Sequence, residues 1–108
     1  MVVTEGSDAL LPCSLSTKQS VVQGVFDWKK DKPQKEVFFY TPGTHYNNGR
    51  SGQSVEFKGR VFHFQDELKH GNTSIIIKDT KAADSGNYTC VFPRVQPPEE
   101  YNIELVVG

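Results

Sequence analysis

Hydrophobic and polar residues alternate over short stretches along much of this chain, which is the pattern of half-buried β-strands. In the first stretch, residues 8–15, one face would carry Ala9, Leu11, Cys13 and Leu15. Six further stretches have strand character: residues 23–30, 36–41, 60–64, 73–79, 87–92 and 100–107. Turn-forming residues separate them, and none has the longer period of an amphipathic helix. The pattern therefore predicts an all-β chain that folds as a sandwich or a barrel.

Length and net charge limit the classes of protein to which the chain can belong. Its 108 residues are enough for one domain, which we expect to span residues 1–108. Twelve basic and thirteen acidic residues give a net charge of −1, which excludes a dedicated nucleic-acid binder and a polybasic membrane patch. No stretch approaches about 18 consecutive apolar residues, so we expect no direct membrane insertion by this fragment.

The chain has only two cysteines, Cys13 and Cys90, which lie far apart in the sequence. A tetrahedral zinc site needs four Cys or His ligands, normally supplied as close pairs, so zinc does not fit. One long-range disulfide is the natural interpretation, and it implies an oxidising compartment. Met1 is followed by Val2 and Val3 rather than by a leader sequence, so we expect that a secretion signal has been removed.

A tryptophan stands in the strand that follows the first cysteine. In a two-sheet sandwich, a disulfide between Cys13 and Cys90 would join the two sheets, and Trp28 would pack against it. The loop closed by this bond is long, so the chain-entropy model gives about 4–5 kcal/mol of stabilisation. These three residues therefore predict the centre of the core.

A second group of residues stands just before Cys90. Tyr88 is placed where a tyrosine corner hydrogen-bonds back to the preceding turn, and Gly86 permits the tight backbone there. We expect the carboxylate of Asp84 to pair with the guanidinium of Arg60, which begins an earlier strand. Such a pair would close one end of the sandwich.

In this order, the two cysteines, the tryptophan, the arginine and the tyrosine corner resemble the immunoglobulin V-set pattern over essentially the whole chain. Residues 57–61 and 71–77 are similar to butyrophilins, myelin oligodendrocyte glycoprotein and costimulatory or coinhibitory ligands of T cells. Residues 37–40 and 46–50 fit the same group. The resemblance implies a V-type, two-sheet Greek-key sandwich on the extracellular side of the plasma membrane, as the ectodomain of a single-pass membrane protein.

Catalytic and metal chemistry are not expected. The only histidines are His45, His63 and His70, and none has the spacing of a metal site on a shared element. No serine lies in a strand–turn–helix nucleophile setting. The sequence therefore predicts that the chain is not an enzyme and needs no cofactor. Recognition of another molecule is the function that remains.

The resemblance implies recognition through the front sheet, built from the strands around Trp28, 37–40, 89–92 and 101–107. Because alternate residues of a strand face opposite sides, an inward Trp28 and Cys90 would place their neighbours outward. We predict an outward set of Lys29, Phe38, Tyr40 and Val91, with Asp27 and Thr89 at its edge. The register of residues 37–40 is not fixed by the sequence. The alternative is that Phe38 or Tyr40 packs under residues 42–48 or against Tyr101.

Residues 93–99 join the last two strands and contain three prolines, which would lower the entropy cost of binding. This is also the favoured contact loop of the family that the chain resembles. The predicted contact residues are Pro93, Arg94, Val95 and Gln96. Alternatively, the prolines only end the strand and protect an edge. Residues 47–54 are polar and are expected to be a solvated connector.

Two N-glycosylation sequons are present, at Asn72 and Asn87. Asn72 falls in a predicted turn and is expected to be the better acceptor. Asn87 stands beside the tyrosine corner and is expected to be less accessible. Both are expected to leave the front sheet bare.

The sequence therefore predicts an extracellular recognition domain of a cell-surface immune regulatory protein, whose partner is another cell-surface protein. The alternative within this class is homophilic or heterophilic adhesion, in which the front sheet could pair with its own copy as a homodimer. Two other interpretations are a small-ligand site around Arg94, for sialic acid or lipid, and a structural spacer without an exposed hydrophobic patch.

Overall fold

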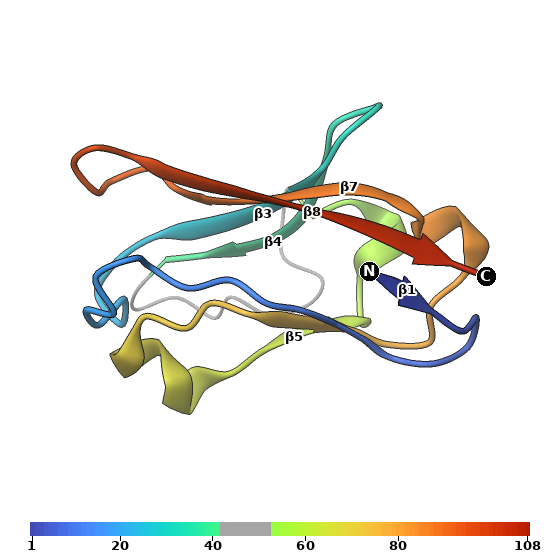
Figure 1. Ribbon diagram of the computed structural model, residues 1–108, viewed down its shortest axis with the longest axis horizontal. Helices are drawn as coiled ribbons and strands as arrows, with labels where there is room; N and C mark the ends of the chain where they lie inside the picture. The colour runs from blue at the N-terminus through green and yellow to red at the C-terminus, as the bar shows by residue number, and fades with distance from the viewer. Residues whose placement is uncertain (42–52) are drawn as a thin grey trace.

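The computed structural model describes residues 1–41 and 53–108, which form two β-sheets packed face to face (Figure 1). The front sheet has five strands in the order β1-β8-β7-β3-β4, and the back sheet has three in the order β2-β6-β5. The all-β sandwich predicted from the sequence is therefore confirmed. His45, residues 46–50 and most of the predicted connector at 47–54 lie outside the described residues.

The front sheet is built around four antiparallel strands. β3 (Phe26–Lys30) pairs with β4 (Lys35–Tyr40) on one side and with β7 (Gly86–Phe92) on the other. β7 pairs in turn with β8 (Glu99–Val107), the longest strand, and β1 (Val2–Val3) runs parallel to the end of β8. The two termini therefore lie side by side at one end of the sandwich (Figure 1).

The back sheet is made of short strands, β2 (Ala9–Leu11), β5 (Val61–His63) and β6 (Ile75–Ile77). β2 is shorter than the predicted strand because Pro12 has no N–H for the ladder. The Cys13 N–H instead donates to the Ser74 hydroxyl (3.1 Å). Three short 3-10 helices connect the strands: η1 (Val55–Phe57), η2 (Gln65–His70) and η3 (Ala82–Asp84).

The disulfide between Cys13 and Cys90 joins the segment after β2 to β7, as the sequence predicts. Trp28 is fully buried beside it, and its indole N–H donates to the Thr73 carbonyl (2.9 Å). Because Thr73 lies just before β6, this hydrogen bond also connects the two sheets. The tryptophan therefore fills the core without leaving its polar atom unsatisfied.

The end of the sandwich near η3 is closed by a buried ion pair. Arg60 donates to both carboxylate oxygens of Asp84, at 3.2 Å and 2.5 Å, and Asp84 is only 2% exposed. The hydrogen bonds that Arg60 donates to the Asp84 carboxylate raise the pKa of the guanidinium. The Tyr88 hydroxyl donates to the backbone carbonyl of Asp84 (2.6 Å), which makes the tyrosine corner. One short segment thus anchors both the guanidinium and the ring.

The prediction that Phe38 and Tyr40 face the solvent is wrong, since only 3% and 2% of their surfaces are exposed. Tyr40 lies opposite Phe26, and Phe38 lies opposite Trp28. Directly opposed residues share a side of the sheet, so both rings belong to the core. The Tyr40 ring stacks on Phe26 at a centroid distance of 5.0 Å, and its hydroxyl donates to the Val22 carbonyl (2.8 Å).

The physical reason is a β-bulge in β4. Two consecutive residues of β3 lie opposite Glu36 and Phe38, so Val37 is an extra residue in the ladder. Val37 and Phe38 are therefore both buried although they are neighbours. Strict alternation places only one of them inside. In the actual register, Phe39 lies opposite Asp27 and is the aromatic residue of β4 on the outer side.

Candidate recognition surface

The outer side of the front sheet, here called the front face, is built by β3, β4, β7 and β8. Strand register identifies its members, because opposed residues in neighbouring strands share a side. Its residues are Asp27, Lys29, Asp31, Glu36, Phe39, Asn87, Thr89, Val91, Glu100, Asn102 and Glu104. The structure therefore brings together four of the predicted positions, Asp27, Lys29, Thr89 and Val91. It places Phe38 and Tyr40 on the opposite side.

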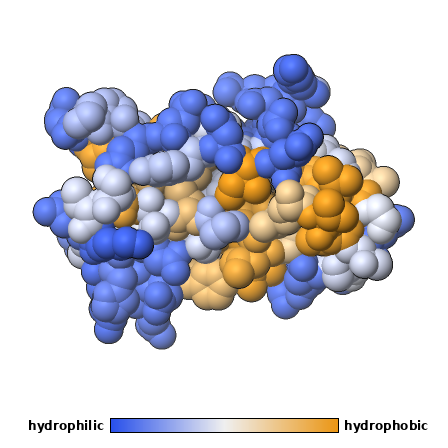
Figure 2. Space-filling view, viewed as in Figure 1, coloured by the Kyte–Doolittle hydropathy of each residue, from blue (hydrophilic) through white to orange (hydrophobic). Residues whose placement is uncertain are grey.

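The front face is acidic. Its charged groups are five carboxylates and one ammonium group, from Asp27, Asp31, Glu36, Glu100, Glu104 and Lys29. Its formal charge is −4, whereas the whole chain has −1, so the rest of the chain carries +3. Figure 2 shows a mostly hydrophilic upper rim, where the front sheet lies, and hydrophobic residues around β1 and the N-terminus. The charge is thus unevenly distributed between the front face and the rest of the chain.

A shallow hollow of about 350 Å³ lies within the front face. Residues of β3, β7 and β8 and of the turn after β3 line it: Lys29, Asp31, Gln34, Thr89, Val91, Glu100 and Asn102. The Thr89 hydroxyl donates to Oδ1 of Asn102 (2.8 Å), which fixes the floor between β7 and β8. Val91 provides the apolar part of a lining that is otherwise polar. A protruding polar side chain of a partner would fit this hollow.

Asp27 sits beside the hollow with only 13% of its side chain exposed. Its Oδ2 lies 3.6 Å from the Lys29 ammonium nitrogen. Its Oδ1 is buried and has no hydrogen-bond partner among the described residues. A buried carboxylate oxygen without a donor is costly to the folded state. The front face is therefore not optimised for stability at this position.

The loop between β7 and β8 lies at the end of the front face where β3 begins (Figure 1). Pro93, Arg94 and Gln96 are exposed, and Val95 packs partly against the core. All four are predicted contact residues. The arrangement presents three of them to solvent, while Val95 anchors the loop.

Glu99 fixes the base of this loop to the first half of the chain. Its carboxylate accepts hydrogen bonds from the backbone N–H and hydroxyl of Ser16 (3.0 and 2.7 Å) and from the Tyr101 hydroxyl (2.7 Å). These hydrogen bonds, led by that of the Ser16 hydroxyl, lower the pKa of Glu99. Sequence reasoning missed this cluster because its members are far apart in the chain.

The model of the immunoglobulin V-set domain family matches residues 1–108. This chain belongs to the V-set family. Among curated relatives, bovine butyrophilin subfamily 1 member A1 is 31% identical over 103 residues, or 95% of this chain and 19% of that protein. Myelin-oligodendrocyte glycoprotein of Macaca fascicularis is 26% identical over 102 residues, or 94% of this chain and 40% of that protein. The resemblance to this group is therefore confirmed.

Solved structures agree with this assignment. The crystal structure of bovine butyrophilin superposes with a TM-score of 0.83 at 31% identity, covering 98% of this chain and 49% of that one. The human B7-H4 IgV-like domain superposes with a TM-score of 0.82 at 25% identity, covering 99% of this chain and 90% of that one. The chain spans only about a fifth of the length of the first curated relatives it matches.

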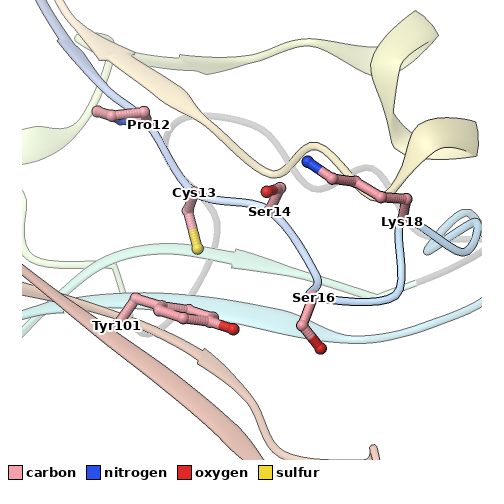
Figure 3. A pocket seen from close by; sticks show the side chains of 6 residues that line it. All are labelled: Pro12, Cys13, Ser14, Ser16, Lys18 and Tyr101. Carbon is pink, nitrogen blue, oxygen red and sulfur yellow. The ribbon is translucent and has the colours of Figure 1, made fainter.

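A second hollow of the V-set domain lies off the front face, at the edge between the sheets. It measures about 390 Å³ and is lined by Pro12, Cys13, Ser14, Ser16, Lys18 and Tyr101 (Figure 3). In this view the Cys13 sulfur is directed toward the strand that carries Tyr101. Its polar groups are three hydroxyls and one ammonium group. This lining does not contain the set of nucleophile, base and acid side chains that a catalytic site needs.

Of the two histidines among the described residues, His63 is the more buried in the V-set sandwich. Its ring packs on Phe38 and Tyr40, at centroid distances of 5.2 and 5.8 Å, and burial lowers its pKa. His70 is exposed. In residues 1–41 and 53–108, no group of three or more His, Cys, Asp or Glu side chains could hold a metal ion. No helix in this part of the chain is long and apolar enough to cross a membrane.

The two sequons of the V-set domain lie in different surroundings from those expected. Asn72 is partly buried, and its Oδ1 accepts hydrogen bonds from the N–H and the hydroxyl of Ser74 (3.0 and 2.6 Å). Asn87 is exposed and belongs to the front face, opposite Glu104. The prediction that Asn87 is the less accessible side chain is therefore wrong. So is the prediction that both sequons lie off the front sheet, because β7 carries Asn87 on its outer side.

Proposed function

We propose that this V-set domain is the extracellular recognition module of a cell-surface immune regulatory protein of the butyrophilin and costimulatory-ligand kind. It binds a protein partner through the front face and through Pro93, Arg94 and Gln96, and it performs no catalysis. The observation that carries the proposal is the concentration of charge around a hollow with Val91 at its side. The similarity to bovine butyrophilin and to the human B7-H4 domain supports it.

The charge of the front face also indicates the chemistry of the partner. A surface of formal charge −4 attracts a basic surface and accelerates encounter with it. Two front faces that met across a two-fold axis would bring like charges together, which is unfavourable. We therefore favour a heterophilic partner with lysine and arginine side chains over the homophilic alternative. Sedimentation velocity tests this choice: a dimer that dissociates on Val91→Glu substitution, which adds a further negative charge to each face, would support homophilic pairing instead.

The binding experiment uses the domain as a tetramer against a library of cell-surface ectodomains, followed by surface plasmon resonance on the partner found. Val91→Glu and Glu100→Lys should each weaken binding at least about tenfold, as expected for contact residues near the centre of an interface. Asp66→Lys, in η2 on the back-sheet side, is the control for a change of charge. Thermal unfolding of each variant separates lost binding from lost fold. Normal binding by both front-face variants would refute this surface.

A further inference from the structure

Asn87 is the one sequon asparagine on the front face, and its side chain is open to solvent. It lies near the start of β7, between β3 and β8. Its backbone carbonyl accepts a hydrogen bond from the Asp31 N–H (2.9 Å), so its backbone is held in the sheet. No hydrogen bond holds its side chain among the described residues. The amide nitrogen is therefore available without loss of a hydrogen bond among the described residues.

The second sequon differs in each of these respects. The Asn72 side chain is partly buried and accepts two hydrogen bonds from Ser74. The Ser74 hydroxyl in turn accepts from the Cys13 N–H, next to the disulfide. Asn72 thus belongs to the hydrogen-bonded packing around the disulfide. Of the two, Asn87 is the position that the folded domain leaves free for modification.

We propose that Asn87 carries an N-linked oligosaccharide, and that this glycan covers one end of the front face. In the reaction a bond forms between Nδ2 of Asn87 and C1 of the first N-acetylglucosamine. The bond from that carbon to the diphosphate of a lipid-linked oligosaccharide donor breaks, the diphosphate leaves, and the amide nitrogen loses one proton. Thr89 supplies the hydroxyl residue that the sequon requires. The disulfide agrees with passage through the compartment where this transfer occurs.

The position of Asn87 divides the front face into two ends. From Asn87 to Phe92, at the other end of β7, the strand rises by about 16 Å. A glycan on Asn87 covers the end that holds Asp31 and Glu104. It leaves open Val91 and the exposed loop residues. This division rests on the proposed function, and it places the partner's footprint at the loop end. It also keeps two front faces from packing flat against each other.

The experiment compares wild type with Asn87→Gln and Asn72→Gln, each secreted from mammalian cells. After reduction and alkylation, trypsin releases Asn87 in the peptide of residues 82–94 and Asn72 in the peptide of residues 70–78. Peptide N-glycosidase in ¹⁸O-water marks each glycosylated asparagine as labelled aspartate. We expect label on residues 82–94 in wild type and in N72Q, and loss of that glycan mass in N87Q. An unlabelled Asn87 in secreted wild type overturns the proposal, whatever the state of Asn72.

Two further variants, both at Thr89, test whether loss of the glycan comes from loss of the sequon or from misfolding. Thr89→Ser keeps the sequon and the hydroxyl that donates to Asn102, so the glycan should remain. Thr89→Val removes the hydroxyl with little change of shape, so the glycan should disappear. The measurement needs no partner, so a bare Asn87 leaves the proposed function intact. Conversely, front-face variants that bind normally refute the proposed function without any change in glycan occupancy.

Discussion

On the inner side of the front sheet, Trp28, Tyr88 and Phe92 are almost completely buried. One position away on the same strands, Lys29 and Val91 are partly exposed on the outer side. The inner side also satisfies its polar atoms, since the tryptophan and tyrosine side chains both donate to backbone carbonyls. The outer side carries a net charge and, in Asp27, a carboxylate oxygen that has no donor within residues 1–41 and 53–108. The same strands thus place the packing that stabilises the fold on one side and the proposed recognition surface on the other.

The largest expected effect on stability is at Phe38, on the inner side of the front sheet, whose orientation was predicted wrongly from the sequence. Phe38→Ala should lower the free energy of unfolding by about 3–5 kcal/mol, because it leaves a cavity between the sheets. Phe62, on the outer side of the back sheet, is 44% exposed. Phe62→Ala is the matched control and should cost less than about 1 kcal/mol. Denaturant unfolding measures both; equal costs would contradict the burial of Phe38.

The next effect concerns the ion pair that joins the ends of the two sheets. Arg60→Ala leaves Asp84 buried without its guanidinium and should cost about 3 kcal/mol, the lower end of the range for a buried pair because Arg60 is partly exposed. The exposed pair of Lys78 and Asp8 provides the comparison. Lys78→Ala should cost less than about 1 kcal/mol. If the two variants unfold at the same denaturant concentration, the buried pair has no special role.

The residues that the sequence predicts well belong to a pattern that runs along the whole chain or to the spacing within one corner. The disulfide and Trp28 follow from the two cysteines and the order of these three residues, and the tyrosine corner follows from the position of Tyr88 two residues before Cys90. All three lie where the sequence predicts them. Which side chains of β4 face the core could not be predicted from the sequence. One extra residue, Val37, reverses the alternation for the residues that follow it. Nothing in the sequence of β4 alone marks that bulge, which exists only in the pairing with β3.

The acidic front face escaped sequence reasoning for a related reason. Its carboxylates come from β3, the turn after β3, β4 and β8, and the outermost two, Asp27 and Glu104, are 77 positions apart in the chain. The alternation within β8 contains a usable signal, since inward Leu105 and Val107 imply that Glu100 and Glu104 face outward. Only the pairing of β7 with β8 shows that Glu100 lies beside Val91 and Glu104 beside Asn87.

A smaller effect involves pH and the contact between β5 and the inner side of the front sheet. Burial lowers the pKa of His63 in the folded protein, whereas the pKa of His63 in the unfolded chain is about 6.5. The unfolded chain therefore binds more protons below this pH, and the contribution of His63 is present above about pH 6.5 and lost as the pH falls toward the folded pKa. The melting temperature should decrease between pH 7.5 and 5.5.

His63→Gln should make that decrease smaller, because it removes the titrating group at the contact with Phe38 and Tyr40. His70→Gln, at an exposed position, is the control and should leave the decrease unchanged. Differential scanning calorimetry at both pH values provides the measurement. If H63Q and wild type lose the same number of degrees, protonation at the inner side of the sheet does not limit stability.

The smallest effect on stability, and the sharpest separation of the two sides, is expected at Asp27. Asp27→Asn removes a charge whose Oδ1 has no donor among the described residues, and it weakens an ion pair with Lys29 that is partly exposed. These changes oppose each other, so the free energy of unfolding should stay within about 0.5 kcal/mol of wild type or rise slightly. Binding to a basic partner should weaken, and less so at high salt, because the lost interaction is electrostatic. Denaturant unfolding and surface plasmon resonance at two salt concentrations check both parts. A variant that loses stability but keeps its affinity would show that the Asp27 carboxylate stabilises the fold and does not contact the partner, and the proposed separation between the two sides of the sheet would then be wrong at this residue.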